Sequence, residues 1–288
     1  MPEALPSNSI QVPVNKIILF SAVDGPGNRT AIFLQGCNLD CTYCHNPETR
    51  NLCVNCGQCV SACPAGALTA EDGKIRYHAE NCLQCDTCIY ICPHGSTPKI
   101  QWMTPQEVFD RVKTQIPFIR GITVSGGECT LYPRFLEELF LLCQEAGLST
   151  LIDSNGTLVF SKYEGLLQVT DGVMLDIKAF DPKQHKQVTG AFNSLVLANA
   201  CYLANRGKLY EVRTVVVPGL FDAKETVLKT ARLLKPYLSI RDIRYKIIAY
   251  RPNGVRKEYA GYPSPEPAFL EELAALVREE GFSDILIT

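Results

Sequence analysis

The crowding of cysteines in one segment restricts how this chain can fold more than any other feature. Eleven of its fourteen cysteines lie between Cys37 and Cys92, while Cys129, Cys143 and Cys201 are scattered. The first ten residues lack the basic end and apolar run of a signal peptide, and no stretch has the apolar length of a membrane span. We therefore expect a cytoplasmic protein, in which clustered, reduced cysteines indicate metal or redox chemistry and not a disulfide framework.

The cysteine-rich segment contains an internal repeat. Residues 53–67 (CVNCGQCVSACPAGA) and residues 82–96 (CLQCDTCIYICPHGS) match at an offset of 29 residues, cysteine on cysteine and proline on proline. A duplication with such a local shift in composition predicts an inserted module. We place this module at residues 51–99 and the main domain at residues 1–50 and 100–288.

Each half of the repeat reads CxxCxxCxxxCP, the spacing with which bacterial two-cluster ferredoxins hold 4Fe-4S clusters. In that arrangement the fourth cysteine of each run serves the other cluster. The predicted ligand sets are Cys53, Cys56, Cys59 and Cys92 for one cluster, and Cys82, Cys85, Cys88 and Cys63 for the second. Four-cysteine zinc knuckles are the alternative, since CxxC pairs alone would allow them, but the duplication and the Cys-Pro endings favour iron–sulfur clusters.

Outside the module, short β-rich runs alternate with amphipathic segments. Strands are expected at residues 30–35, 121–125, 149–153, 172–177, 210–218, 243–250 and 284–288, and helices at residues 104–116, 132–147, 194–207, 222–235 and 265–281. Repeated βα units predict an α/β fold with a parallel sheet, and about six units suit a partial (β/α)6 barrel. A ligand is then expected at the carboxyl ends of the strands.

A second cysteine motif, GCNLDCTYCHNP at residues 36–47, follows the first expected barrel strand. Its spacing is CxxxCxxC, and three thiolates can hold only three irons of a cubane, which leaves one iron open to a substrate. A zinc site completed by His45 is the alternative. Zinc sites more often use two ligand pairs separated by a loop, so the spacing favours a cluster.

The motif, with Tyr43 before the last cysteine, resembles that of the radical S-adenosylmethionine (SAM) superfamily. The resemblance implies that Cys37, Cys41 and Cys44 hold a catalytic 4Fe-4S cluster whose open iron binds SAM. One electron would then cleave SAM to a 5′-deoxyadenosyl radical that abstracts hydrogen. The adenine side of SAM would be lined by Tyr43, His45 and Asn46. The sequence SGGE at residues 125–128 looks like the superfamily's GGE motif. This match makes Gly126, Gly127 and Glu128 candidates for binding the cofactor.

Further segments narrow the resemblance. The chain resembles the activating enzymes of glycyl radical enzymes in several segments: DGPGNR (24–29), CxYCHNP, DSNG (153–156), MLDIK (174–178) and VRTVVVPG (212–219). Among these activases, an inserted eight-cysteine module is typical of a large subgroup, and the overall pattern looks most like the YjjW-type activases. Such an enzyme removes a Cα hydrogen from one glycine of a large partner enzyme. The resemblance implies three 4Fe-4S clusters, a flavodoxin or ferredoxin as electron donor, and Asp24 and Arg29 as candidates for gripping the glycine-bearing loop.

The resemblance also assigns roles to charged strand ends. The positions Asp153, Ser154, Met174 and Asp176 match those that hold a monovalent cation, Na⁺ or K⁺, beside the SAM carboxylate, and hard oxygen ligands suit such an ion. Asp176 also matches a contact to the SAM amino group, while Lys178 and Arg213 would neutralise the carboxylate. A surface salt pair is the alternative for Asp176 and Lys178. Where the family has a ribose-binding His, this chain has Arg251, so that contact is either lost or supplied by Arg251.

Charge and composition restrict the partners. A net charge of −2 with no long basic run argues against nucleic acid as a partner, so we expect a small-molecule or protein partner. We also expect the chain to act as a monomer. Three rival functions remain open. They are a radical maturase that modifies a peptide side chain, an iron–sulfur electron-transfer protein, and a zinc-binding interaction module. In such maturases the auxiliary clusters usually lie in a carboxyl-terminal extension. The sequence names neither the partner nor the role of the two module clusters.

Overall fold

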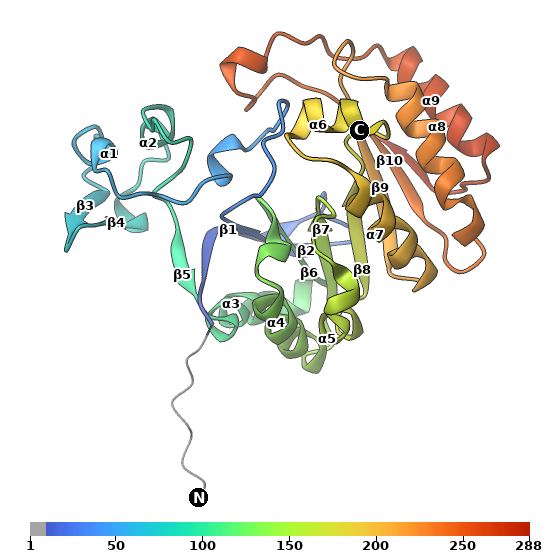
Figure 1. Ribbon diagram of the computed structural model, residues 1–288. Coiled ribbons are helices and arrows are strands. Elements are labelled where there is room, and N and C mark those ends of the chain that lie inside the picture. The colour runs from blue at the N-terminus through green and yellow to red at the C-terminus, as the bar shows by residue number, and fades with distance from the viewer. Residues whose placement is uncertain (1–9) are drawn as a thin grey trace, which may run out of the picture.

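The computed structural model describes residues 10–288, and its core is one nine-stranded sheet in the order β11-β10-β9-β8-β7-β6-β2-β1-β5 (Figure 1). Residues 1–9, most of the stretch in which no signal peptide is expected, lie outside the described part. Neighbouring strands from β2 to β11 pair in parallel. All seven expected strands are present, as β2 (Arg29–Leu34), β6 (Gly121–Gly126), β7 (Ser149–Ser154), β8 (Gly172–Asp176), β9 (Leu209–Val216), β10 (Arg244–Ala249) and β11 (Ile285–Ile287).

The sheet is open, because its edge strands β5 and β11 do not pair with each other within residues 10–288. Two strands at the β5 edge of the sheet were not expected from the sequence. Strand β1 (Val12–Ser21) runs antiparallel to β2, and the three-residue β5 (Gln101–Met103) runs antiparallel to β1. Neither strand belongs to a βα unit, so the alternation that reveals the parallel strands does not mark them. The fold is thus α/β with a largely parallel sheet.

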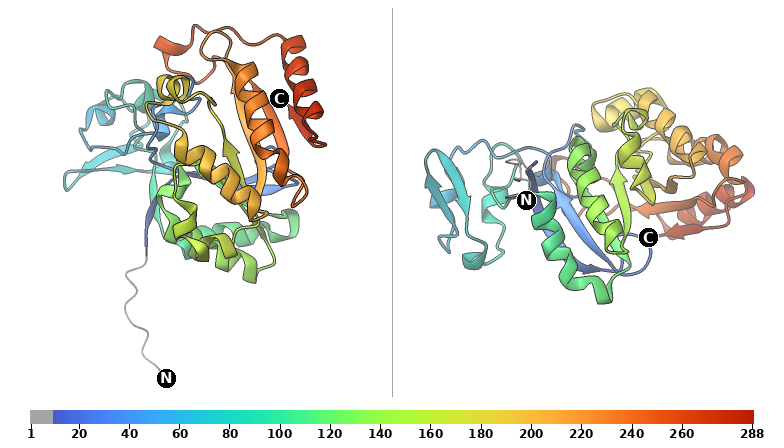
Figure 2. Two further views of the ribbon diagram at one scale, coloured as in Figure 1. Left: turned by 45° about the vertical axis from the view of Figure 1, so that its right-hand side comes forward. Right: turned by 90° about the horizontal axis from the view of Figure 1, so that it is seen from below.

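Helices cover the outer face of the sheet, as Figure 2 shows. The helix α4, for example, buries apolar side chains at helical spacing, among them Phe135, Leu139 and Cys143. Cys143 is a core residue, whereas Cys201 is only half-buried. The helices of the main domain are α3 (Pro105–Val112), α4 (Pro133–Glu145), α5 (Glu164–Gln168), α6 (Pro182–Thr189), α7 (Ser194–Asn205), α8 (Ala223–Leu234) and α9 (Pro267–Glu279), of which α5 and α6 were not expected.

Side-chain caps fix where several helices begin. Thr104 and Glu107 form a reciprocal capping box at the start of α3, and the Asp222 carboxylate accepts a hydrogen bond from the backbone of Glu225 in α8. The described part of the chain also contains seven 3-10 segments: η1 (Pro47–Thr49), η2 (Ala79–Asn81), η3 (Lys113–Phe118), η4 (Cys129–Leu131), η5 (Phe160–Lys162), η6 (Lys235–Tyr237) and η7 (Lys257–Tyr259). Within residues 10–288, no helix is both long and apolar enough to cross a membrane.

Residues 51–99 project from one side of the sheet, next to β5 (Figure 1). They contain α1 (Gln58–Ser61), β3 (Leu68–Glu71), β4 (Lys74–Tyr77) and α2 (Thr87–Tyr90) around a small separate core. The two halves share backbone conformation at corresponding positions, because left-handed backbone recurs 29 residues apart in three pairs: Asn55 and Gln84, Gly57 and Asp86, and Gly66 and Gly95. The repeat seen in the cysteine spacing therefore extends to the path of the backbone.

Candidate active site

A cavity of about 1110 Å³ opens at the carboxyl ends of the parallel strands, where a ligand was expected. It brings together fourteen of the residues singled out from the sequence: Cys37, Cys41, Tyr43, Cys44, His45, Asn46, Gly126, Gly127, Glu128, Asp153, Ser154, Asp176, Lys178 and Arg213. Two further candidates, Met174 and Arg251, do not line it. The residues come from four strands, β6, β7, β8 and β9, and from the loop after β2, so the sheet brings them together.

Backbone hydrogen bonds to two neighbouring segments hold the three-cysteine loop after β2. On one side, the N–H groups of Gly36 and Cys37 donate to the carbonyl groups of Thr49 and Arg50, each at 2.8 Å. On the other side, the N–H of Thr42 donates to the carbonyl of Val188 at the end of α6, at 2.9 Å. The loop is therefore fixed at both flanks independently of any bound group.

The three cysteines of this loop are free thiols in a largely buried setting. Burial raises the pKa of Cys41 to about 12, and it also raises the pKa values of Cys37 and Cys44. The positive charge of Lys178 opposes this shift at all three positions. Thiols in such a site stay protonated unless a cation replaces the proton, which is the behaviour of buried metal ligands.

The glycines that end β6 are required by close backbone packing. A Cβ atom on Gly126 would lie 2.1 Å from the carbonyl oxygen of Leu34, and one on Gly127 would lie 2.3 Å from that of Gly36. The same contact carries two hydrogen bonds, from the N–H of Gly127 to Leu34 at 2.9 Å and from the N–H of Glu128 to Gly36 at 2.7 Å. The GGE motif thus presses directly against the base of the cysteine loop.

The Glu128 side chain is 2% exposed and holds the end of β7 in place. One carboxylate oxygen accepts hydrogen bonds from the N–H and hydroxyl groups of Thr130, at 3.0 and 2.5 Å, and from the Ser154 hydroxyl at 2.9 Å. The other oxygen accepts the backbone N–H of Asn155 at 2.6 Å. Burial raises the pKa of Glu128, while these hydrogen bonds oppose the rise. Although Glu128 lines the cavity, both of its carboxylate oxygens accept hydrogen bonds from other groups of the protein.

A buried ion pair joins β7 and β9. Arg213 pairs with Asp153 at 2.9 Å and with Glu211, and it donates to the Met174 sulfur at 2.9 Å. Burial acts to lower the pKa of Arg213, but the two carboxylates raise it overall. Burial raises the pKa of Asp153, and Arg213 counteracts that rise. Three of the residues predicted to hold a monovalent cation therefore already have protein partners for their side chains, since Ser154 bonds Glu128.

A second pair lies beside the cysteine loop. The Lys178 ammonium group contacts Asp176 at 2.9 Å and lies 5.7 Å from the centre of the Tyr43 ring. Burial acts to lower the pKa of Lys178, but Asp176 and the neighbouring Cys41 and Tyr43 raise it overall. The Lys178 side chain is 13% exposed, so the pair is not the surface salt bridge that the sequence left open as an alternative. It places a permanent positive charge next to the cysteines.

The loop after β10 contributes a residue that sequence reasoning missed. The Arg256 guanidinium lines the cavity, pairs with Asp40 at 2.7 Å and donates to the carbonyl of Cys41 at 3.1 Å. Arg251, the expected ribose contact, is exposed outside the cavity, and its carbonyl lies 2.8 Å from Nε2 of His45. Both arginines follow the same strand, so sequence position alone could not separate them.

The partner-binding role predicted for Arg29 is wrong. Its side chain is 1% exposed and donates to the Thr123 hydroxyl at 2.9 Å and to the Ile122 carbonyl at 2.6 Å. Arg29 begins β2 and pairs with the first residue of β6, so the turn with Asp24 lies at the amino ends of the strands, opposite the cavity. Asp24 itself is half-buried and accepts a hydrogen bond from Ser21.

The module gathers its eight cysteines around two small hollows. One is lined by Cys53, Cys56, Cys59 and Cys92, and the other by Cys63, Cys82, Cys85 and Cys88, which are the two exchanged sets expected from the spacing. All eight are free thiols. Cys92 also reaches the edge of the large cavity, so the first set is the nearer one to the three-cysteine loop. Within residues 10–288, no three His, Cys, Asp or Glu side chains converge closely enough for a single metal ion.

Comparison with known proteins supplies the family. The model of the radical SAM superfamily matches residues 31–234. The pyruvate formate-lyase-activating enzyme of Streptococcus mutans is 35% identical, over 88% of this chain and 82% of its own. A putative glycyl-radical enzyme activating enzyme of Haemophilus influenzae is 32% identical, over 97% of each chain. The choline trimethylamine-lyase activating enzyme of Oleidesulfovibrio alaskensis is 30% identical, over 91% and 94%.

Solved structures with low sequence identity share the fold. Streptococcus suis SuiB bound to S-adenosylmethionine is 14% identical with a TM-score of 0.57, over 88% of this chain and 48% of that one. QueE from Escherichia coli is 13% identical with a TM-score of 0.51, over 96% of this chain and 94% of that one. At these identities the likeness concerns the fold alone.

Proposed function

Because the chain belongs to the radical SAM superfamily and, within it, to the glycyl-radical enzyme activating enzymes, we propose that the cavity at the strand ends is where it activates its partner. The observation that best supports this function is that the three cysteines of the CxxxCxxC loop share the cavity with the GGE motif and with the charged ends of β7, β8 and β9. An activase needs a cluster with one open iron, room for SAM, and access for a glycine. The cavity offers ligands, charges and volume for all three.

The residues present fit the implied cofactors. The catalytic 4Fe-4S cluster would be held by Cys37, Cys41 and Cys44, whose buried thiols lie beside the ammonium group of Lys178. When bound, it would supply the one electron for reductive cleavage of SAM to methionine, and a Cα hydrogen would pass from a partner glycine to the 5′-deoxyadenosyl fragment. Glycine suits this step because no side chain blocks approach to its Cα.

The chain's own residues orient and shield this chemistry. The pair of Lys178 with Asp176 presents both signs of charge to the amino acid end of SAM, and Arg213 adds a positive charge at the adjacent strand end. Glu128 and the GGE glycines position the loop after β7 against the cysteine loop. The segment of Tyr43, His45 and Asn46 would line the adenine side, and Arg256 is available in place of Arg251 on the ribose side.

A monovalent cation remains part of the proposal. Asp153 and Met174 are partners in the register of β7 and β8, which brings their backbone oxygens into one region with Ser154 and Asp176. Because the side chains of Asp153 and Ser154 have protein partners, backbone oxygens would carry much of the coordination. Dependence of SAM cleavage on K⁺ or Na⁺, with the other ion and a large organic cation as controls, tests this site.

Residues 51–99 are proposed to bind two further 4Fe-4S clusters, one on each exchanged cysteine set, as a ferredoxin-like domain inserted in the radical SAM domain. The two hollows support this, since each gathers three closely spaced cysteines and the distant fourth. The clusters would pass electrons from a flavodoxin or ferredoxin towards the cavity, which Cys92 reaches. Iron and sulfide analysis of anaerobic protein separates this from zinc binding, which would give a colourless, iron-free preparation.

The test of the function is a reconstitution under strict exclusion of oxygen. The holoenzyme, SAM and a reductant are incubated with purified glycyl radical enzymes, including pyruvate formate-lyase and choline trimethylamine-lyase, and electron paramagnetic resonance (EPR) is used to detect a glycyl doublet. The expected result is a doublet with one enzyme, formed together with 5′-deoxyadenosine. A reduced holoenzyme that cleaves no SAM would refute the proposal.

A further inference from the structure

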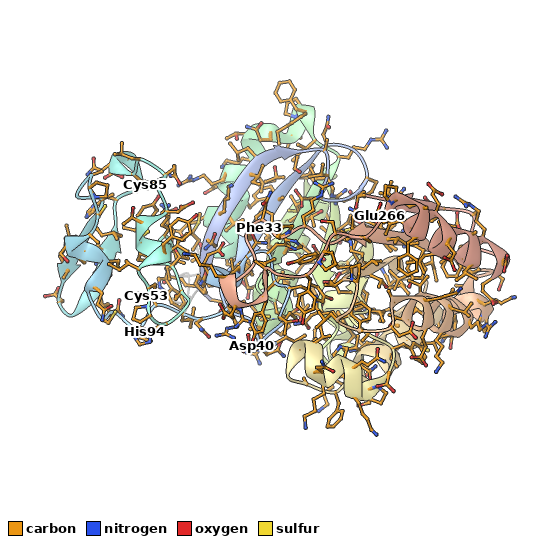
Figure 3. All side chains as sticks on the ribbon, turned by 90° about the horizontal axis from the view of Figure 1, so that it is seen from above. Phe33, Asp40, Cys53, Cys85, His94 and Glu266 are labelled. Carbon is orange, nitrogen blue, oxygen red and sulfur yellow. The ribbon has the colours of Figure 1, made fainter. Side chains whose placement is uncertain are left out.

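The module forms one wall of the cavity, which metal binding in the module does not require. Five of its residues line the cavity together with the three-cysteine loop: Asp86, Ile89, Tyr90, Cys92 and Gly95. On another side the rim consists of residues 254–258 from the loop after β10. Figure 3 shows the module, marked by Cys53, Cys85 and His94, beside the loop that carries Asp40. A polypeptide that enters the cavity between these two walls would contact both of them.

Tyr90 is the exposed apolar feature of this wall. Its side chain is 81% exposed even though it borders the cavity, and large exposed aromatic groups at the rim of a site mark contact surfaces. The preceding residue, Ile89, is partly buried against the small core of the module. Ile89 therefore has a packing role inside the module, whereas the Tyr90 ring has none.

The internal repeat provides a built-in comparison. Ile89 corresponds to Val60 in the first half of the module, and both pack on the small core. Tyr90 corresponds to Ser61, which is exposed and does not line the cavity. Since both halves present the same cysteine spacing and backbone conformation, cluster binding does not require an aromatic residue at this position. The aromatic ring is present only in the half that borders the cavity.

We propose that Tyr90 contacts the glycine-bearing segment of the partner enzyme as that segment enters the cavity, so that the inserted module helps to select the substrate. This inference rests on the proposed function. The occupant is an extended peptide with a glycine at its centre and an apolar side chain next to it, which packs on the Tyr90 ring. A peptide that reaches the catalytic cysteines also reaches Tyr90, because both line the same continuous cavity. Across the rim, the exposed Lys257 and Glu258 face the peptide with polar groups.

The test uses reconstituted holoenzyme and a capped heptapeptide with apolar residues around a central glycine deuterated at Cα. Deuterium in 5′-deoxyadenosine measures the Michaelis constant and kcat for the peptide, and 5′-deoxyadenosine formed without peptide reports SAM cleavage alone. Tyr90→Ser should raise the Michaelis constant about tenfold, which corresponds to about 1.4 kcal/mol, with kcat and peptide-free cleavage within twofold of wild type. Tyr90→Phe should restore the wild-type value because it keeps the ring.

A matched control is Phe118→Ser, which removes a 65% exposed aromatic ring that does not line the cavity and should change nothing. A Michaelis constant for Tyr90→Ser within twofold of wild type would overturn the inference. So would slower cluster reduction by flavodoxin, or lost self-association, with peptide kinetics unchanged, since Tyr90 would then serve an electron donor or a second copy. A wild type that cleaves SAM but takes deuterium neither from the peptide nor from pyruvate formate-lyase would refute the proposed function itself, and the inference with it.

Discussion

The substitution Glu128→Gln separates a structural role for this residue from direct contact with SAM. The carboxylate accepts four hydrogen bonds in a site that is 2% exposed. Glutamine offers one oxygen and one NH₂ group, so in either orientation a backbone N–H, that of Thr130 or that of Asn155, faces another donor. Losing a hydrogen bond to a charged acceptor and leaving a buried N–H unpaired should together cost about 3 kcal/mol.

Anaerobic melting of the reconstituted holoenzyme measures this loss. For a chain of this size, about 3 kcal/mol corresponds to a drop in Tm of roughly 6 °C. SAM affinity, followed by equilibrium dialysis, should fall as well, because the loop that begins at Asn155 loses its anchor. Glu138→Gln is the matched control, since Glu138 is an exposed residue of α4 and its substitution should move Tm by less than about 1 °C.

The opposite pattern would refute the reasoning. A Glu128→Gln holoenzyme that melts like wild type but binds SAM more than tenfold less tightly would show that the carboxylate acts on the cofactor and not on the fold. A loss of both properties, with normal iron content, is the outcome that the hydrogen bonds predict.

Three further perturbations follow from the same contacts. Gly127→Ala should displace the cysteine loop, because its Cβ would meet the Gly36 carbonyl at 2.3 Å, and should lower 5′-deoxyadenosine formation more than tenfold, whereas Gly261→Ala, with open space around it, should not. Lys99→Met should lower the midpoint potential of one module cluster in an EPR-monitored titration, since Lys99 lines one hollow and its cation favours the more negative reduced cluster; Lys99→Arg should keep the potential. Burial lowers the pKa of His185, so as pH falls through about 6.5 the unfolded chain takes up a proton that the folded chain does not. Holoenzyme stability should then fall by up to about 1.4 kcal/mol per pH unit, and His185→Asn should reduce that slope in melts between pH 7.5 and 6.

The sequence allowed the parallel strands and most of the cavity lining to be predicted because both follow from chain-local patterns. The alternating pattern of each βα unit indicates where its strand lies. In a parallel sheet, the residues that follow two neighbouring strands lie close together at the same edge. The cysteine spacing was equally informative, since the exchange of Cys63 and Cys92 between the two sets recurs in the two hollows.

What the sequence did not reveal depends on distant partners. Arg29 has the appearance of a surface charge, but its hydrogen-bond acceptors at Thr123 and Ser149 lie 94 and 120 positions away, and only the folded sheet brings them to its guanidinium. The choice between Arg251 and Arg256 depends in the same way on where the loop after β10 meets His45. A Cβ on Gly254 in that loop would lie 2.4 Å from the His45 carbonyl, so the backbones touch there.

The position of the module also follows from a distant contact, which links it to the cysteine loop. Gln35, the residue two places before Cys37, is fully buried and donates from its side-chain amide to the carbonyls of Glu48 and Asn51, each at 2.7 Å. Asn51 forms a bridge with Ser96 where the chain enters and leaves the module, and the Ser96 hydroxyl donates to the Asn51 carbonyl at 2.7 Å. One buried amide therefore ties the neck of the module to the loop that carries Cys37, Cys41 and Cys44. A module held in this way can place a residue such as Tyr90 at a constant distance from these cysteines, which a flexibly tethered domain could not do.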